Sequence, residues 1–335
     1  MNITAIAKAS GVSVATVSRI LNHEDGVSDE VRRKTMEVIE RNGYRPRGNV
    51  RRNTRLGVVV RSDAPSFDSF FSRVFTGVSA YAFEAGIETS LIYFSPKQVG
   101  ESVSLAEILR KKRCNGAVMI SPAEADDVES MKAARIPLVL VTSRREEKSV
   151  GYIDCNCFQG AYEQTRYLIR LGHRRIGFLC GQLDGNVDHQ ERLAGFKKAM
   201  EEAEIKLPSG LIVEHDASGL SEFAGYKQAG WLLDRDPSVT AIFATNDLMA
   251  CGAICRCAEM GLKVPEDISV VGYDDNPGSR FYNPPLTTVR QPLRRMGYDA
   301  ARAVDLKLKG KSEELPTQVL ENELIVRQSC APPSR

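Results

Sequence analysis

The sequence has no apolar run of 18 or more residues within its 335 positions. A helix that crosses a bilayer needs about 20 consecutive, mostly apolar residues, so we expect no membrane span. The N-terminus also lacks the apolar segment of a secretory signal, and we therefore expect a cytoplasmic protein. The composition, 42% hydrophobic and 26% charged, is ordinary for a globular chain of more than one domain.

Common catalytic motifs are also missing. The chain contains no G-x-S-x-G, no P-loop, no H-E-x-x-H and no G-x-G-x-x-G after a strand. The spacing of its histidines does not suggest metal ligands; they are His23, His173, His189 and His215. We therefore expect no catalytic residue, no cofactor and no metal.

The eight cysteines do not follow the C-x2-C spacing of zinc sites. Cys155 and Cys157 are separated by one residue, and three more lie close together at Cys251, Cys255 and Cys257. This proximity leaves a metal site open as an alternative. No histidine lies nearby and the second group falls in an apparent helix, so the sequence favours reduced cysteines that pack in the protein interior.

Residues 3–22 show two short helical patterns separated by Gly11-Val12-Ser13. Gly11 suits a reversal of the chain and Ser13 suits the N-cap of a second helix. Two helices joined by so short a turn are typical of a helix-turn-helix. The second helix carries small and hydroxyl side chains on its first turns, which fit a major groove, and Arg19, which can bind a guanine edge. An ordinary surface hairpin is the alternative. Ser28 is a candidate N-cap for a third helix.

Charge is distributed unevenly. Residues 1–55 carry a net charge of +5, whereas the remainder carries −3. A basic module favours DNA, because neutralising phosphates supplies most non-specific affinity. Residues 45–55 contain five arginines and no acid, which predicts an arm along phosphates or a minor groove; a solvated tether is the alternative.

From Leu56 onward, short apolar runs alternate with amphipathic helical patterns, which predicts parallel, doubly wound sheets in two similar subdomains. Ligands bind beyond the carboxyl ends of such strands. The first polar residues there are Asp63, Ser121, Thr142, Asp154, Asp216, Asn246 and Asp274. A cleft lined by Asp, Asn and Ser suits a neutral polyhydroxylated ligand, although each residue alone could also be a helix cap.

Specific motifs resemble those of the lactose-repressor (LacI/GalR) family of bacterial transcription regulators. The order Ile6-Ala-x-x-x-Gly11-Val-Ser-x-x-Thr16-Val-Ser-Arg-x-Leu-Asn22 is similar to the headpiece of that family, and so is Gly43-Tyr-Arg-Pro46. Further matches are Arg192-Leu-Ala-Gly-Phe196, Ala244-Thr-Asn-Asp247 and Val264-Pro-Glu-Asp267. Segments 192–208 and 252–265 are most similar to purine-responsive members.

The resemblance implies an α/β protein with a three-helix helix-turn-helix headpiece and a periplasmic-binding-protein-like pair of parallel-sheet subdomains. We expect the headpiece in residues 1–46, a basic hinge in 47–55 and an effector-binding, dimerisation domain in 56–335. The N-subdomain would hold about 56–153 and 290–316, and the C-subdomain about 158–284 and 320–330. The hinge is shorter than that of most relatives and lacks their leucine wedge, with only Val50 as an apolar candidate.

The resemblance further implies a homodimeric repressor that binds palindromic double-stranded operator DNA under the control of a small effector. Residues expected to contact DNA are Thr4, Ser13, Val14, Ala15, Thr16, Ser18, Arg19, Asn22, Tyr44, Arg45 and Arg51. Residues expected to contact the effector are Phe70, Phe71, Ser121, Arg192, Phe223, Asn246 and Asp274. A carbohydrate effector is favoured. A solute-binding protein of the same fold and a regulator that responds to a nucleobase corepressor are the alternatives.

Overall fold

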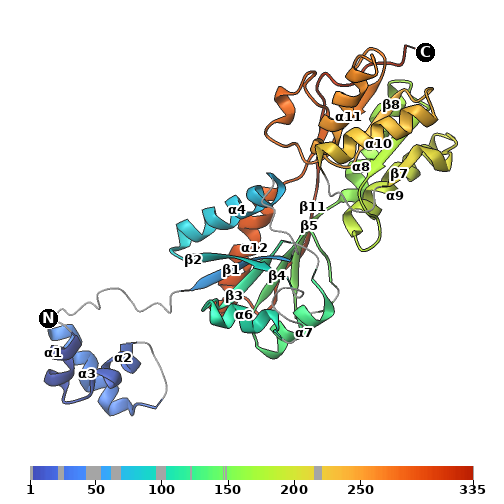
Figure 1. The fold of residues 1–335 in the computed structure, drawn as a ribbon. Helices are drawn as coiled ribbons and strands as arrows, with labels where there is room; N and C mark the ends of the chain where they lie inside the picture. The colour runs from blue at the N-terminus through green and yellow to red at the C-terminus, as the bar shows by residue number, and fades with distance from the viewer. Residues whose placement is uncertain are drawn as a thin grey trace. The chain divides into compact units, whose positions relative to one another are not determined.

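The computed structural model describes residues 3–21, 26–42, 54–61, 69–95, 103–120, 123–145, 147, 149–214 and 221–334. The chain forms two compact units, Met1–Thr54 and Arg55–Arg335, which are described separately. Figure 1 shows the elements of each unit in chain order. None of the described helices is long and apolar enough to cross a membrane.

The first unit contains three helices: α1 (Ile3–Ser10), α2 (Val14–Leu21) and α3 (Asp29–Arg41). Gly11 adopts a positive φ of 66° in the turn after α1, which explains the glycine there. The backbone N–H of Thr16 donates to Ser13 Oγ at 3.0 Å, so Ser13 caps α2 as predicted. Ser28 occupies the N-cap position of α3, but its side chain makes no capping hydrogen bond.

A small apolar core holds the three helices together. It consists of Ile6 and Ala7 from α1, Val17 from α2 and Ile39 from α3. These residues recur at helical spacing in the sequence, and each helix therefore buries one face against the other two. The opposite face of α2 stays exposed.

The larger sheet of the second unit has six parallel strands in the order β11-β5-β4-β3-β1-β2. The strands are β1 (Arg55–Arg61), β2 (Glu88–Phe94), β3 (Gly116–Met119), β4 (Leu138–Val141), β5 (Gly151–Cys155) and β11 (Thr317–Leu320). Val58 packs with α4 (Ser69–Ala85) and α12 (Leu293–Leu308) on one face. Val59 packs with α6 (Leu105–Lys111) and α7 (Ala125–Ala133) on the other. The strands are therefore apolar on both sides, as parallel strands between helix layers must be.

The smaller sheet has four parallel strands in the order β7-β6-β8-β9. They are β6 (Ile176–Cys180), β7 (Ile212–Glu214), β8 (Ala241–Ala244) and β9 (Ser269–Val271). Helices α10 (Glu222–Arg235) and α11 (Asp247–Glu259) cover one face, while α8 (Cys157–Arg170) and α9 (Val187–Glu202) cover the other. Two short 3-10 helices, η1 (Ser209–Leu211) and η2 (Ser279–Phe281), lie in loops.

Three chain segments connect the two sheets. One leads from β5 to α8, one leads from β10 (Thr288–Arg290) to α12, and one leads from β11 to β12 (Glu323–Ile325). Strands β10 and β12 form an antiparallel pair. The predicted fold class, a helix-turn-helix headpiece with two doubly wound parallel sheets, is confirmed. The strand ends on both sheets now define where a ligand can bind.

Candidate effector cavity and DNA-reading helix

A cavity of about 300 Å³ takes its lining from both sheets of the second unit; we call it the central cavity. Its volume is at the lower end of the range of small-molecule pockets, about 300–1,000 Å³. The lining residues are Arg61, Phe70, Phe71, Ile120, Thr142, Ser143, Gly185, Asn186, Val187, Asp188, His189, Arg192, Asn246 and Asp274.

Arg192 is the most constrained of the charged residues in the central cavity. It lies on α9, is only 4% exposed, and its guanidinium carbon stacks 3.9 Å from the centre of the Tyr273 ring. Its Nη1 donates to the Thr245 carbonyl at 2.5 Å. Burial opposes the charged form, but attraction from Cys157, Asp274 and other neighbours outweighs burial and raises the pKa of Arg192. The guanidinium is therefore a fixed cation, and its Nε is buried and has no hydrogen-bond partner within the described part of the chain.

Asp274 lies opposite this cation, with its Oδ1 3.9 Å from Arg192 Nη2. Its φ of 108° is unusual for a residue with a side chain. The conformation is held by the Asp274 N–H, which donates to the Val289 carbonyl at 2.8 Å, and by Gln291 Nε2, which donates to Asp274 Oδ1 at 2.5 Å. These bonds make Asp274 a positioned acceptor at the wall of the central cavity.

Asn246 combines two roles that the sequence left as alternatives. Its Oδ1 accepts the Met249 N–H at 2.7 Å and caps α11, as the capping alternative predicted. The same residue lines the central cavity. The capping hydrogen bond holds the Asn246 side-chain amide at the start of α11, at the wall of the central cavity.

Asp188 and His189 add two titratable groups at the start of α9. Burial raises the pKa of Asp188 to about 7, since the favourable charge of Arg192 is opposed by nearby acids such as Asp154. Burial lowers the pKa of His189 to about 3, so its ring is neutral near pH 7. His189 Nδ1 is buried and has no hydrogen-bond partner among the described residues. Buried polar atoms of this kind usually bind a ligand or a water molecule.

The apolar part of the wall comes from Phe70 and Phe71 at the start of α4. Their ring centroids lie 5.6 Å apart with the planes at 89°, an edge-to-face pair. Aromatic side chains in a pocket provide apolar surface for a ligand.

The structure brings together five of the predicted effector residues: Phe70, Phe71, Arg192, Asn246 and Asp274. It does not bring Phe223 to the central cavity. That ring is 59% exposed on the first turn of α10, where Lys227 Nζ lies 4.5 Å from its centroid. Ser121 lies outside the described residues. The sequence reasoning missed Arg61, although Arg61 ends β1 and the rule of strand ends would have found it.

The predicted DNA-reading residues lie on the exposed surface of the first unit. Ser13, Val14, Ala15 and Arg19 are exposed, Thr16 and Ser18 are half-buried, and Thr4 is exposed on α1. Val17 and Ile20 of α2 are buried, so the small and polar side chains of α2, together with Val14, lie on its other face. Asn22, Tyr44, Arg45 and Arg51 lie outside the described residues.

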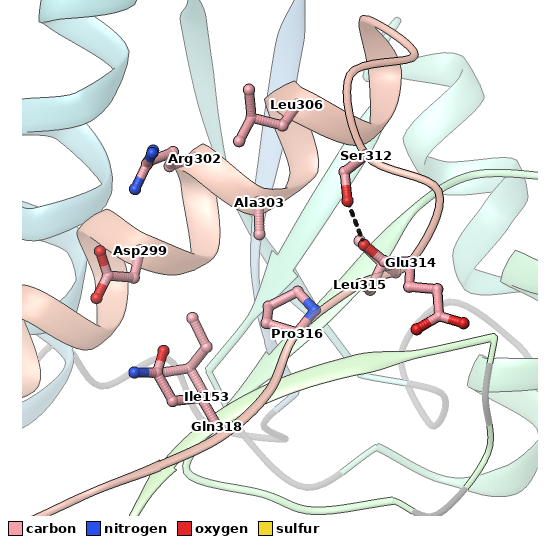
Figure 2. Close-up of a pocket in the computed structure, with 10 residues that line it drawn as sticks. All are labelled: Ile153, Asp299, Arg302, Ala303, Leu306, Ser312, Glu314, Leu315, Pro316 and Gln318. Atoms are coloured by element: carbon pink, nitrogen blue, oxygen red, sulfur yellow. Dashed lines mark hydrogen bonds between the residues drawn. The ribbon is translucent and has the colours of Figure 1, made fainter.

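A second groove, of about 360 Å³, lies beside β11 (Figure 2). Asp299, Arg302 and Leu306 of α12 form one side, and Leu315 and Pro316 form the other. None of its lining residues belongs to the central cavity. The bond drawn in it, from Ser312 Oγ to the Glu314 carbonyl at 2.6 Å, orders the loop that leads into β11.

Comparison with known proteins agrees with this geometry. Residues 2–47 match the model for bacterial regulatory proteins of the lacI family, and residues 165–330 match a periplasmic binding protein-like domain. The chain is 33% identical over 333 residues to the HTH-type transcriptional repressor PurR of Pasteurella multocida (strain Pm70), covering 97% of each chain.

Two solved structures are similar over nearly the whole chain. The complex of the transcriptional regulator CelR with cellobiose has a TM-score of 0.74 and 30% identity, and covers 98% of this chain and 99% of that chain. The lac repressor dimer bound to operator and the anti-inducer ONPF has a TM-score of 0.73 and 26% identity, covering 99% of both chains. The chain belongs to the lacI family of bacterial regulatory proteins and is a DNA-binding transcriptional regulator.

Proposed function

We propose that the protein is a repressor whose affinity for a palindromic operator is set by a neutral sugar or sugar derivative in the central cavity. The observation that carries this proposal is the pairing of the Phe70–Phe71 wall with the positioned polar groups of Arg192, Asn246 and Asp274. A sugar has an apolar ring face and a rim of hydroxyls, each of which donates and accepts.

The charges of the central cavity also favour a neutral ligand. Arg61 pairs with Asp127 of α7, and Arg192 lies beside Asp274. Each cation therefore has an acidic neighbour inside the protein. A ligand with a full negative charge would have to compete with these carboxylates, whereas hydroxyl groups bridge them. Cellobiose in the similar CelR complex agrees with a carbohydrate.

A nucleobase corepressor is the second candidate. Segments 192–208 and 252–265 resemble purine-responsive relatives, and the two aromatic rings of the central cavity suit a planar base. Asn186 and Asp188 do not reproduce the polar residues with which such relatives bind their base, although both line the cavity. Direct comparison of the two ligand classes therefore decides between the candidates.

The mechanism that we propose is a shift between two conformations of the effector domain. In this proposal the N-subdomain comprises about residues 56–153 and 290–316, and the C-subdomain comprises about residues 158–284 and 320–330. A ligand that contacts both subdomains stabilises their closed arrangement relative to the open one. The size of this shift in free energy equals the difference between the ligand's binding free energies for the two arrangements. Such a shift changes the spacing of two headpieces on a palindrome, and operator affinity follows.

Large exposed apolar side chains of the second unit support a dimer. Phe83 on α4 is 90% exposed, Phe281 on η2 is 82% exposed, and Trp231 on α10 is half exposed. Aromatic residues are enriched in interfaces between subunits. We propose that a second copy of the chain covers them.

A thermal-shift screen of the full-length protein tests the effector class. Monosaccharides, cellobiose, sugar phosphates, adenine and guanine are compared at equal concentration. A ligand at 100 times its dissociation constant adds about 2.7 kcal/mol of stability. The proposal expects a sugar to raise the Tm of wild type and of Phe223→Ala, and to lose this effect in Phe71→Ala. A shift by a nucleobase alone would establish the second candidate.

A further inference from the structure

Cys155 and Cys157 are two buried thiols at the point where β5 leads into α8. Their sulfur atoms lie 3.8 Å apart, and both cysteines are free. This segment is one of the three connections between the sheets. Neither the helix-turn-helix nor the lining of the central cavity uses these two residues.

The backbone between the two cysteines suits a covalent link. Asn156 has φ −80° and ψ 79°, the values of an inverse γ-turn, which brings the flanking α-carbons close together. A disulfide requires α-carbons about 4.4–6.8 Å apart and a bond of about 2.05 Å between the sulfurs. From 3.8 Å, the sulfurs need to approach by only about 2 Å, shared between two side chains.

Each thiol also contacts a group that holds Asp274. Cys155 Sγ donates to Gln291 Oε1 at 3.0 Å, and Gln291 Nε2 donates to Asp274 Oδ1 at 2.5 Å. On the other side, Arg192 Nη2 donates to Cys157 Sγ at 3.9 Å and lies 3.9 Å from Asp274 Oδ1. The two sulfurs, Gln291, Asp274 and Arg192 thus form a closed ring of contacts that includes two residues of the central cavity.

We propose that Cys155 and Cys157 are an oxidation site, at which a small peroxide forms a reversible disulfide that breaks this ring and changes the central cavity. Cys157 is the first thiol to react, because positive charge of Arg192 lies against its sulfur. Cys157 is fully buried, but it contacts Arg192, which lines the central cavity, and this cavity is the approach that we propose for hydrogen peroxide.

One molecule of hydrogen peroxide oxidises the two thiols to one disulfide and is itself reduced to two molecules of water. Cys157 sulfur attacks a peroxide oxygen, the O–O bond breaks, and the departing hydroxide takes the thiol proton and leaves as water. Cys155 sulfur then attacks the sulfenic acid on Cys157, the S–O bond breaks, and the second hydroxide leaves as water with the proton of Cys155. The hydrogen bond to Cys157 and burial raise the pKa of Cys155, which keeps its proton until this step. A dithiol reductant reverses the reaction.

Disulfide formation removes a donor from the ring. Gln291 is fully buried, and its Oε1 loses the S–H that it accepts in the reduced protein. A buried acceptor without a donor is unfavourable, so the Gln291 amide shifts, and Asp274 shifts with it. The disulfide itself is independent of the ligand class, whereas its effect on effector binding rests on the proposed function.

Peptide mapping of the full-length protein tests the site. The protein is treated with stoichiometric hydrogen peroxide. It is then denatured in the presence of N-ethylmaleimide, which alkylates the remaining free thiols, and digested with trypsin. We expect two of the eight thiols to be lost and the peptide 149–166, which contains both cysteines, to appear unalkylated and two hydrogens lighter. Dithiothreitol should restore all eight thiols. Cys155→Ser and Cys157→Ser should each abolish this peptide product, while Cys255→Ser, at an exposed thiol, should leave it unchanged.

Hydrogen–deuterium exchange provides the second measurement. Peptides covering 186–196 and 272–276 should exchange faster after oxidation of wild type, and not after the same treatment of Cys157→Ser. Full alkylation of peptide 149–166 after peroxide treatment, or conversion of its cysteines to sulfinic acid, overturns the proposal. This result is measured on the wild-type protein, so the test holds even if a variant fails to fold. A protein that forms the disulfide but binds no sugar refutes only the proposed effector.

Discussion

The guanidinium of Arg192 stacks on the Tyr273 ring, with 3.9 Å between its central carbon and the ring centre. Stacking of a cation on a buried aromatic face is favourable when both groups are shielded from water. The Thr245 carbonyl fixes one end of the same guanidinium, and Asp274 lies near the other. The orientation of Arg192 is therefore set before a ligand arrives, and little side-chain entropy remains to be lost on binding.

The first prediction concerns Asp274→Asn. The new amide oxygen still accepts from Gln291, so the Tm should stay near that of wild type, while the charge opposite Arg192 disappears. Hydrogen bonds to charged groups contribute about 1.5–3 kcal/mol, so sugar affinity should fall on the order of tenfold to a hundredfold. Titration calorimetry and thermal melting measure the two quantities. Early melting with unchanged sugar affinity would show that Asp274 only supports the fold.

Much of this site follows from the sequence because strand ends obey a geometric rule. Asn246 and Asp274 come directly after apolar runs, and parallel strands place such residues at one edge of a sheet. Arg192 came only from resemblance, since nothing local distinguishes it from other helical arginines. The spacing of Val17 and Ile20 also predicts which face of α2 is buried and which is exposed, because a small three-helix core needs every apolar side chain.

Other features depend on contacts that the sequence does not encode locally. The raised pKa of Asp188 depends on burial by distant elements, whereas the sequence around it shows only the start of a helix. The misplacement of Phe223 has a similar cause, because the sequence around Phe223 does not determine which way the first turn of α10 faces. The positive φ of Asp274 depends on bonds to Val289 and Gln291, which are remote in sequence.

The second prediction concerns the packing of α10 against α11. A Cβ added at Gly252 would lie 1.8 Å from the backbone carbonyl oxygen of Glu222, closer than any real contact. Gly252→Ala should therefore force the helices apart, and overpacking of this kind costs about 1–3 kcal/mol or more. Urea denaturation measures this loss. Gly210→Ala is the matched control, since among the residues that the structure describes its Cβ would meet only the Arg235 side chain, at 3.5 Å. Equal stability of both variants would contradict the close approach.

The third prediction concerns pH. The pKa of Asp188 is raised to about 7, whereas the same carboxyl titrates near 3.8 when unperturbed. Between these values the folded protein holds a proton that the unfolded chain has released, so this residue makes stability fall as pH rises from about 4 to 7. Above pH 7 both states are ionised and the contribution is constant. Asp188→Asn should flatten the profile in this window, measured by urea denaturation. An unchanged slope would show that Asp188 ionises normally in the folded protein.

The fourth prediction concerns the exposed face of α2. If Arg19 binds a base edge, Arg19→Ala should cost about 1–3 kcal/mol on the cognate operator and leave binding to random DNA nearly unchanged. Arg33→Ala is a suitable control, because Arg33 is an exposed arginine of α3 that pairs with Glu37. The operator is first obtained by selection from random duplexes, and binding is then titrated at several salt concentrations. The slope of log K against log salt should be several units for wild type, because each phosphate that a cation neutralises releases counterions. Arg19→Ala should keep most of that slope, since a base contact releases few counterions. Equal losses on operator and random DNA, with a slope lower by about one, would assign Arg19 to a phosphate instead.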